Sequence, residues 1–112
     1  GLLLDCAHLA IYQRMMGRNP TDGLDDFPLD RVVEIHVAGG TERDAHGFAW
    51  VEDDHTTDVL PDTWAILERV AAGASNLRAV VFECERNSAD DVMPGFQAIQ
   101  DRIRHTPAGG AQ

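Results

Sequence analysis

The sequence predicts an α/β fold in which a parallel sheet with flanking helices makes up about half of a TIM-type (β/α) barrel. Strand-like apolar runs at residues 2–5, 31–37 and 78–83 alternate with segments whose apolar residues recur at helical spacing. Alternation of this kind favours parallel strands joined by right-handed crossovers. A complete barrel needs ~250 residues. The 112 residues of this chain therefore suffice for about half of one.

The first part of the chain contains two of the strand-like runs and the helical segments between them. Residues 2–5 are apolar and end in a carboxylate, which is typical of a buried parallel strand. Residues 6–16 carry apolar side chains at helical spacing, and a short capped helix is expected over residues 21–27. The run at 31–37 is the clearest strand, because it is β-branched and two glycines follow it closely.

The second part is expected to alternate in the same way after a long loop. Residues 38–60 are rich in Gly, Asp, Thr and His and predict a loop, which at that length is usually functional or mobile. Pro61 opens a helix that is expected to reach about residue 72. After the third strand, Ser88 is expected to cap a last helix with an apolar stripe.

Composition favours a single globular domain over residues 1–105, with a disordered tail at 106–112. The net charge is −10, which argues against a nucleic-acid or anionic-membrane partner, because phosphate binding needs clustered Lys and Arg. No apolar run approaches the ~20 residues that a membrane span requires. The expected location is the cytoplasm.

Cys6 and Cys84 do not form a disulfide framework. Each follows a carboxylate at the end of a predicted strand. If these carboxylates point toward the barrel axis, strand alternation turns the two thiols outward, beneath the helices. We therefore expect both cysteines to be buried and unreactive.

Potential metal ligands follow or end each predicted strand. Because active sites of parallel α/β sheets lie at the carboxyl ends of the strands, these side chains are expected to meet. Asp53 and His55 are an i, i+2 pair in the long loop, so extended backbone would put both on one face. Carboxylates and imidazoles together suit Fe(II), Mn or Zn. The predicted ligands are Asp5, His8, His36, Asp53, His55 and Glu83.

Five of these six residues also have an alternative role without a metal. Asp5 could cap the helix that follows it, and His36 could be a buried, hydrogen-bonded side chain. Glu83 could pair with an arginine nearby in the sequence. His8 and Asp53 could be ordinary polar groups on a helix and in a loop. Only the coincidence of these residues at one sheet edge favours a metal site.

Several motifs resemble the C-terminal half of the MbnB/TglH family, barrel enzymes with multinuclear non-haem iron. The resemblance covers nearly the whole chain, and the segment Arg-Val-Val-Glu-Ile-His-Val-Ala-Gly at 31–39 is its most specific part. The matching segments are residues 2–8, 29–39, 53–55, 61–67 and 81–83.

The resemblance implies that iron is bound by His36, Asp53, His55 and Glu83, with Asp5 and His8 at the metal or beside it. Many members carry Asn where this chain has Ala7 and His8, so the metal site nearest the first strand is expected to differ. The family's N-terminal half supplies further ligands. The resemblance therefore implies that this half, or a second copy of the chain, completes the site.

The function implied is that of an iron-dependent oxidative enzyme that modifies a ribosomally made precursor peptide at cysteine. Such enzymes use O2 and often a partner protein that presents the peptide. Two alternatives stay open at this stage. One is a divalent-metal isomerase or hydrolase of the xylose-isomerase-like barrel type, with Mn or Zn, and the other is a non-catalytic assembly module.

Overall fold

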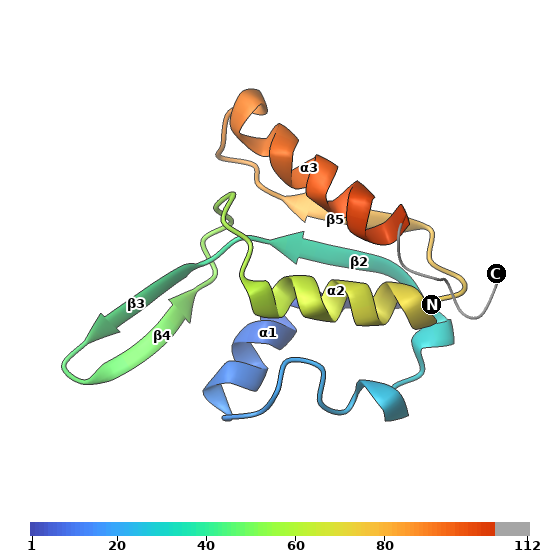
Figure 1. Cartoon of the computed structure of the whole chain (residues 1–112), viewed down its shortest axis with the longest axis horizontal. Coiled ribbons are helices and arrows are strands. Elements are labelled where there is room, and N and C mark those ends of the chain that lie inside the picture. The colour runs from blue at the N-terminus through green and yellow to red at the C-terminus, as the bar shows by residue number, and fades with distance from the viewer. Residues whose placement is uncertain (105–112) are drawn as a thin grey trace.

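The computed structural model describes residues 1–104, in which the strands of the main sheet alternate with helices (Figure 1). The strands of the main sheet are β1 (Leu2–Asp5), β2 (Val32–Ala38) and β5 (Ala79–Glu83). The α-helices are α1 (Cys6–Met15), α2 (Pro61–Gly73) and α3 (Ala89–Arg104). The predicted α/β class with a parallel sheet is confirmed. Within residues 1–104 no helix has the length and apolar character needed to cross a membrane.

The main sheet has the strand order β1-β2-β5, and both pairings are parallel. Asp5 lies beside His36 in the register of β1 and β2. Ala38 lies beside Glu83 in the register of β2 and β5. Because all strands point the same way, their carboxyl ends share one edge of the sheet. The sheet is open in the described residues, consistent with part of a TIM-type barrel.

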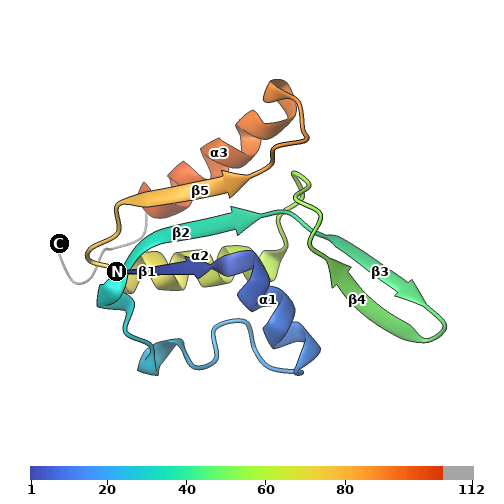
Figure 2. The ribbon, with the colours of Figure 1, turned by 180° about the vertical axis from the view of Figure 1, so that it is seen from behind.

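The two faces of this sheet differ in burial. Helices α2 and α3 lie against one face, and the strands are uncovered on the other face (Figure 2). Ile35 and Val37 of β2 point to the helical side and are both 0% exposed. Leu3 and Val81 point to the uncovered side and are 53% and 39% exposed. The hydrophobic core therefore lies between the sheet and the helices.

The prediction of a loop over residues 38–60 is wrong in its middle. Residues 41–52 form an antiparallel hairpin of β3 (Thr41–Ala45) and β4 (Phe48–Glu52), which projects from the sheet (Figure 2). His46 and Gly47 both have positive φ, 53° and 77°, as a two-residue type I′ turn requires. Most hairpin residues are exposed, so the sequence lacks the buried alternation by which strands are recognised.

The expected helix at residues 21–27 is also wrong, since only a 3-10 turn forms at Leu24–Asp26. Leu24 is the buried residue of this turn, so the segment lacks the repeated apolar stripe that stabilises a longer helix. Gln13 of α1 is almost fully buried and donates hydrogen bonds to the carbonyl oxygens of Pro20 and Asp22, at 3.3 and 2.8 Å. This side chain fixes the segment against α1.

The two cysteines differ from each other. Cys6 is fully buried, as predicted, and burial raises the pKa of its thiol far above the usual range. Cys84 is only half-buried, and its thiol donates to the carbonyl oxygen of Phe82 at 3.4 Å. The expectation of full burial is therefore wrong for Cys84, because this residue lies just past the end of β5.

Candidate metal centre

The six predicted ligands gather at the carboxyl edge of the sheet. Asp5 and Glu83 end their strands, and His36 lies near the end of β2. His8 comes from the first turn of α1, and residues 53–55 follow β4. Each of the six is within 3.6 Å of another member through an ion-pair contact.

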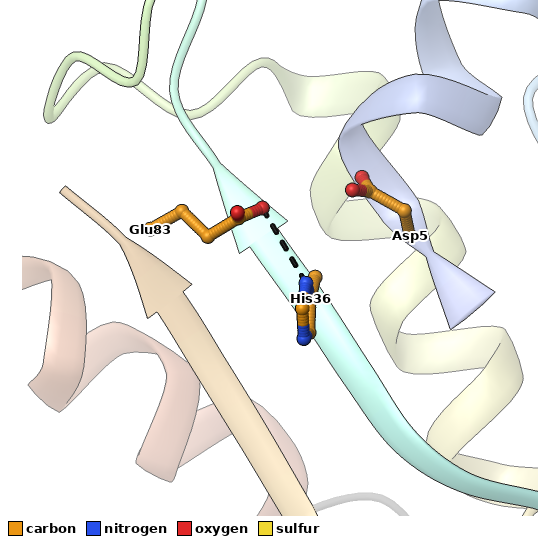
Figure 3. Close-up of side chains that lie close together, drawn as sticks. All are labelled: Asp5, His36 and Glu83. Carbon is orange, nitrogen blue, oxygen red and sulfur yellow. Dashed lines mark ion pairs between the residues drawn. The ribbon is translucent and has the colours of Figure 1, made fainter. Parts of the chain in front are cut away.

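Asp5, His36 and Glu83 form the first group of donor atoms, within 4.8 Å of one another (Figure 3). His36 Nδ1 lies 3.6 Å from Glu83 Oε1. Ligands at about 2.1 Å from one cation have donor atoms no more than about 4.2 Å apart. Small side-chain adjustments would therefore suffice for these three residues to share one ion.

His55, Glu83 and Glu85 form the second group, again within 4.8 Å. His55 Nδ1 lies 3.0 Å from Glu85 Oε2. Glu83 belongs to both groups, so its carboxylate lies between two candidate cation positions. Glu85 was not among the predicted ligands, although its position two residues after Glu83 is a signal of a shared face.

His8 and Asp53 are paired with each other rather than included in either group. His8 Nε2 lies 2.5 Å from Asp53 Oδ2, and His8 Nδ1 lies 3.3 Å from Asp5 Oδ2. Asp53 Oδ1 is in turn 3.6 Å from His55 Nε2. These contacts connect the two groups on the side of α1. Asp5 also accepts a hydrogen bond from the His8 backbone N–H at 2.9 Å, so its alternative role as a helix cap is realised as well.

The backbone around His55 is held close to the ends of β2 and β5. A Cβ atom on Gly39 would lie 2.1 Å from the carbonyl oxygen of Thr56, so only glycine lets the loop pass β2 this closely. Asn87 donates to the carbonyl oxygens of His55 and Cys84, at 2.9 and 3.2 Å. His55 itself has a φ of 55°, which is uncommon for a residue with a side chain. The close approach to Gly39 and the side-chain hydrogen bonds of Asn87 thus fix the position of this backbone.

His36 has a second carboxylate neighbour that the sequence reasoning missed. Glu34 Oε2 lies 2.5 Å from His36 Nε2. The two residues are two positions apart on β2 and so share a face, which is the signal that could have identified Glu34. His46, in contrast, lies in the turn of the hairpin and belongs to neither donor group, and His105 falls outside the described residues.

The electrostatics of the centre favour positive charge. The hydrogen bond with Asp53 raises the pKa of His8, and the charges of Asp5 and Glu83 add to the effect. The hydrogen bond with Glu85 raises the pKa of His55 and lowers that of Glu85. A negative potential that retains protons on imidazoles also attracts a divalent cation. The donor set of carboxylates and imidazoles therefore fits a hard or borderline metal ion.

Comparison with known proteins gives one family. The sequence model of the RiPP precursor modification enzymes MbnB/TglH/ChrH matches residues 1–105. A UPF0276 protein of Rhizorhabdus wittichii is 32% identical over 101 residues, which are 90% of this chain and 33% of that protein. A second, of Bordetella bronchiseptica, is 31% identical over 111 residues, 98% of this chain and 37% of the relative.

A third UPF0276 protein, of Acaryochloris marina, is 37% identical over 68 residues, 61% of this chain and 23% of the relative. The matched regions thus cover only 23% to 37% of the length of these relatives. No solved structure matches.

Proposed function

The chain belongs to the MbnB/TglH/ChrH family of RiPP precursor modification enzymes, and from that membership we propose that it supplies iron ligands to an enzyme that oxidises a ribosomally made peptide. The proposed target is a cysteine of the precursor peptide, with O2 as the oxidant. A partner protein that presents the peptide is part of the proposal.

The observation that carries the proposal is the position of Glu83 in both donor groups. A carboxylate between two cation positions supports a centre with more than one iron ion. Asp5 and His36 would hold one ion together with Glu83, and His55 and Glu85 would hold the other. Iron bound with open coordination positions would supply O2 activation. His8 is exposed beside this centre and holds a proton against Asp53, so it could orient a polar group of the peptide.

The test is anaerobic reconstitution with Fe(II), followed by metal analysis and measurement of O2 uptake. Replacing His36 or His55 by Ala is expected to cut bound iron sharply, with little change in the circular dichroism spectrum, because neither side chain is part of the hydrophobic core. His46→Asn is the matched control, since it removes a histidine from the hairpin turn and Asn tolerates positive φ.

Three outcomes of this experiment separate the candidate functions. Iron with O2 uptake supports the proposal. Preference for Mn or Zn without O2 uptake would favour an isomerase or hydrolase instead. No metal in the wild type would favour a non-catalytic assembly module. Unchanged metal content in both histidine variants would contradict the assigned site.

We also propose that other barrel segments complete the site. In the described residues, 1–104, β1 and β5 are the two edge strands of the main sheet. One face of this sheet carries the exposed side chains of Leu3 and Val81. Open edges and apolar faces of this kind favour association. The proposed occupant is the N-terminal half of the barrel or, for this chain on its own, a second copy of the chain. Light scattering that finds a stable monomer over a wide concentration range would count against self-association.

A further inference from the structure

His36 contacts a different carboxylate through each of its ring nitrogens. Nε2 lies 2.5 Å from Glu34 Oε2, while Nδ1 lies 3.6 Å from Glu83 Oε1. Figure 3 shows the ring with one nitrogen directed toward Glu83 and the other pointing away from it. Only the contact with Glu34 is short enough for a hydrogen bond.

Glu34 lies two residues before His36 on β2, farther from the carboxyl edge of the sheet than the first donor group. Its neighbours in the register are Leu3 of β1 and Ala79 of β5, whereas His36 lies beside Asp5 and Val81. Two positions along a strand correspond to about 6.6 Å. Glu34 thus approaches the ring of His36 from the side opposite the carboxyl edge, where the candidate cation positions lie.

The chemistry of the pair determines the tautomer of the ring. An ionised carboxylate can only accept a hydrogen bond, so the nitrogen that faces Glu34 carries the proton. In a neutral imidazole the other nitrogen then has a free lone pair. That nitrogen is Nδ1, which faces Glu83 and the first donor group.

We propose that Glu34 is a positioning residue that keeps the proton of His36 on Nε2 and thereby presents Nδ1 as the metal-binding atom. The proposal rests on the proposed metal site and specifies how one of its ligands is oriented. Carboxylates that hold ligating histidines in this way typically change metal affinity by about 10- to 100-fold when they are removed.

The first test needs no metal. Long-range proton–nitrogen NMR on the metal-free chain, recorded at alkaline pH, is expected to show His36 as the Nε2–H tautomer, with a proton that exchanges slowly with water. Glu34→Ala should make this proton exchange rapidly, and Glu34→Gln should retain most of the protection, because its amide oxygen still accepts a hydrogen bond. A wild-type ring protonated on Nδ1 would overturn the assignment.

The second test is a double-mutant cycle with Zn²⁺ as the probe, measured by titration calorimetry. Glu34→Ala should weaken Zn²⁺ binding by about 10- to 100-fold. In the His36→Ala background the same change should have no further effect, because Glu34 acts only through His36. Glu68→Gln is the control, since Glu68 is a carboxylate on α2 that pairs with Arg102.

Each result decides the matter. An equal loss of affinity in the His36→Ala background would mean that Glu34 binds the ion directly, and unchanged affinity of Glu34→Ala would mean that it has no role; both overturn the proposal. If the wild-type chain binds no Zn²⁺, the proposed metal site fails, and the NMR experiment alone decides whether Glu34 fixes the tautomer.

Discussion

The two faces of the three-stranded sheet differ in role: one packs against the helices in the hydrophobic core, and the other carries the candidate metal ligands. On β2, Ile35 and Val37 are completely buried under the helices, while Glu34 and His36 point to the uncovered face. Adjacent residues of β2 therefore differ in role, since one set stabilises the fold and the other lies at the candidate metal centre. The comparison teaches that stability and metal binding should respond to substitutions at neighbouring positions independently, and four predictions test this separation.

The largest effect is expected for apolar truncations on the two faces. Ile35→Ala removes a fully buried side chain and should lower the free energy of unfolding by about 2–5 kcal/mol. Val81→Ala on the uncovered face should cost less than about 1 kcal/mol, because Val81 is 39% exposed. Urea unfolding of both variants measures the difference. Equal costs would mean that the uncovered face is also packed in solution.

The two cysteines allow a second comparison, between a buried and a half-buried position. Cys6→Ser places a hydroxyl group in an apolar site and should destabilise the fold by roughly 1–3 kcal/mol. Cys84→Ser should cost clearly less, since Cys84 is half-buried. In thiol titration of the folded chain, Cys6 should stay unreactive and Cys84 should react slowly. Loss of bound metal in Cys84→Ser would show that the two faces have been assigned the wrong way round.

Asp5 is the one residue for which stability and metal binding are expected to change together. Asp5→Ala removes the cap of α1 together with a donor of the first group, so it should cost about 1 kcal/mol and weaken metal binding. Asp5→Asn can still accept the hydrogen bond from the His8 backbone N–H, and it should keep the stability while losing metal affinity. Unfolding and metal titration of the two variants, side by side, would detect this.

The smallest effect is the pH dependence of the metal-free chain. His8 and His55 have raised pKa values in the folded state, so their stabilising contribution is complete below the unfolded value of about 6.5. It is lost as the pH rises through the folded pKa values. The lowered pKa of Glu85 acts in the opposite sense, and its contribution is lost as the pH falls through the folded value.

These groups are solvent-accessible, so the expected change is small. Thermal unfolding of the wild type and of a His8→Gln, His55→Gln double variant between about pH 6 and 9 measures it. A steeper decline in the double variant than in the wild type would contradict the assigned ion pairs.

The main elements could be predicted because they bury regular apolar patterns. The strands at residues 2–5, 31–37 and 78–83 and the helix from Pro61 correspond closely to elements of the structure. The hairpin could not be predicted, because β3 is charged and buries little surface. Its one local signal was His46-Gly47, which takes the positive φ values that Asn-Gly usually provides in such turns.

The candidate site was predictable where the strand ends supply it. Asp5, His36 and Glu83 follow directly from a parallel sheet, because the carboxyl ends of its strands converge. Glu34 and Glu85 were missed, although each lies two positions from a predicted ligand and therefore on the same face. The pairing of His8 with Asp53 depends on how the hairpin returns to the sheet, which no periodicity in the sequence encodes.

The place of Glu83 along the chain also sets the timing of assembly under the proposed function. Asp5, His36 and His55 leave the ribosome well before β5, yet both donor groups include the carboxylate that β5 carries. A growing chain therefore lacks a complete donor group until β5 has been made and has paired with β2. Under the proposed function, iron binding at this edge of the sheet therefore follows the folding of β5 rather than preceding it.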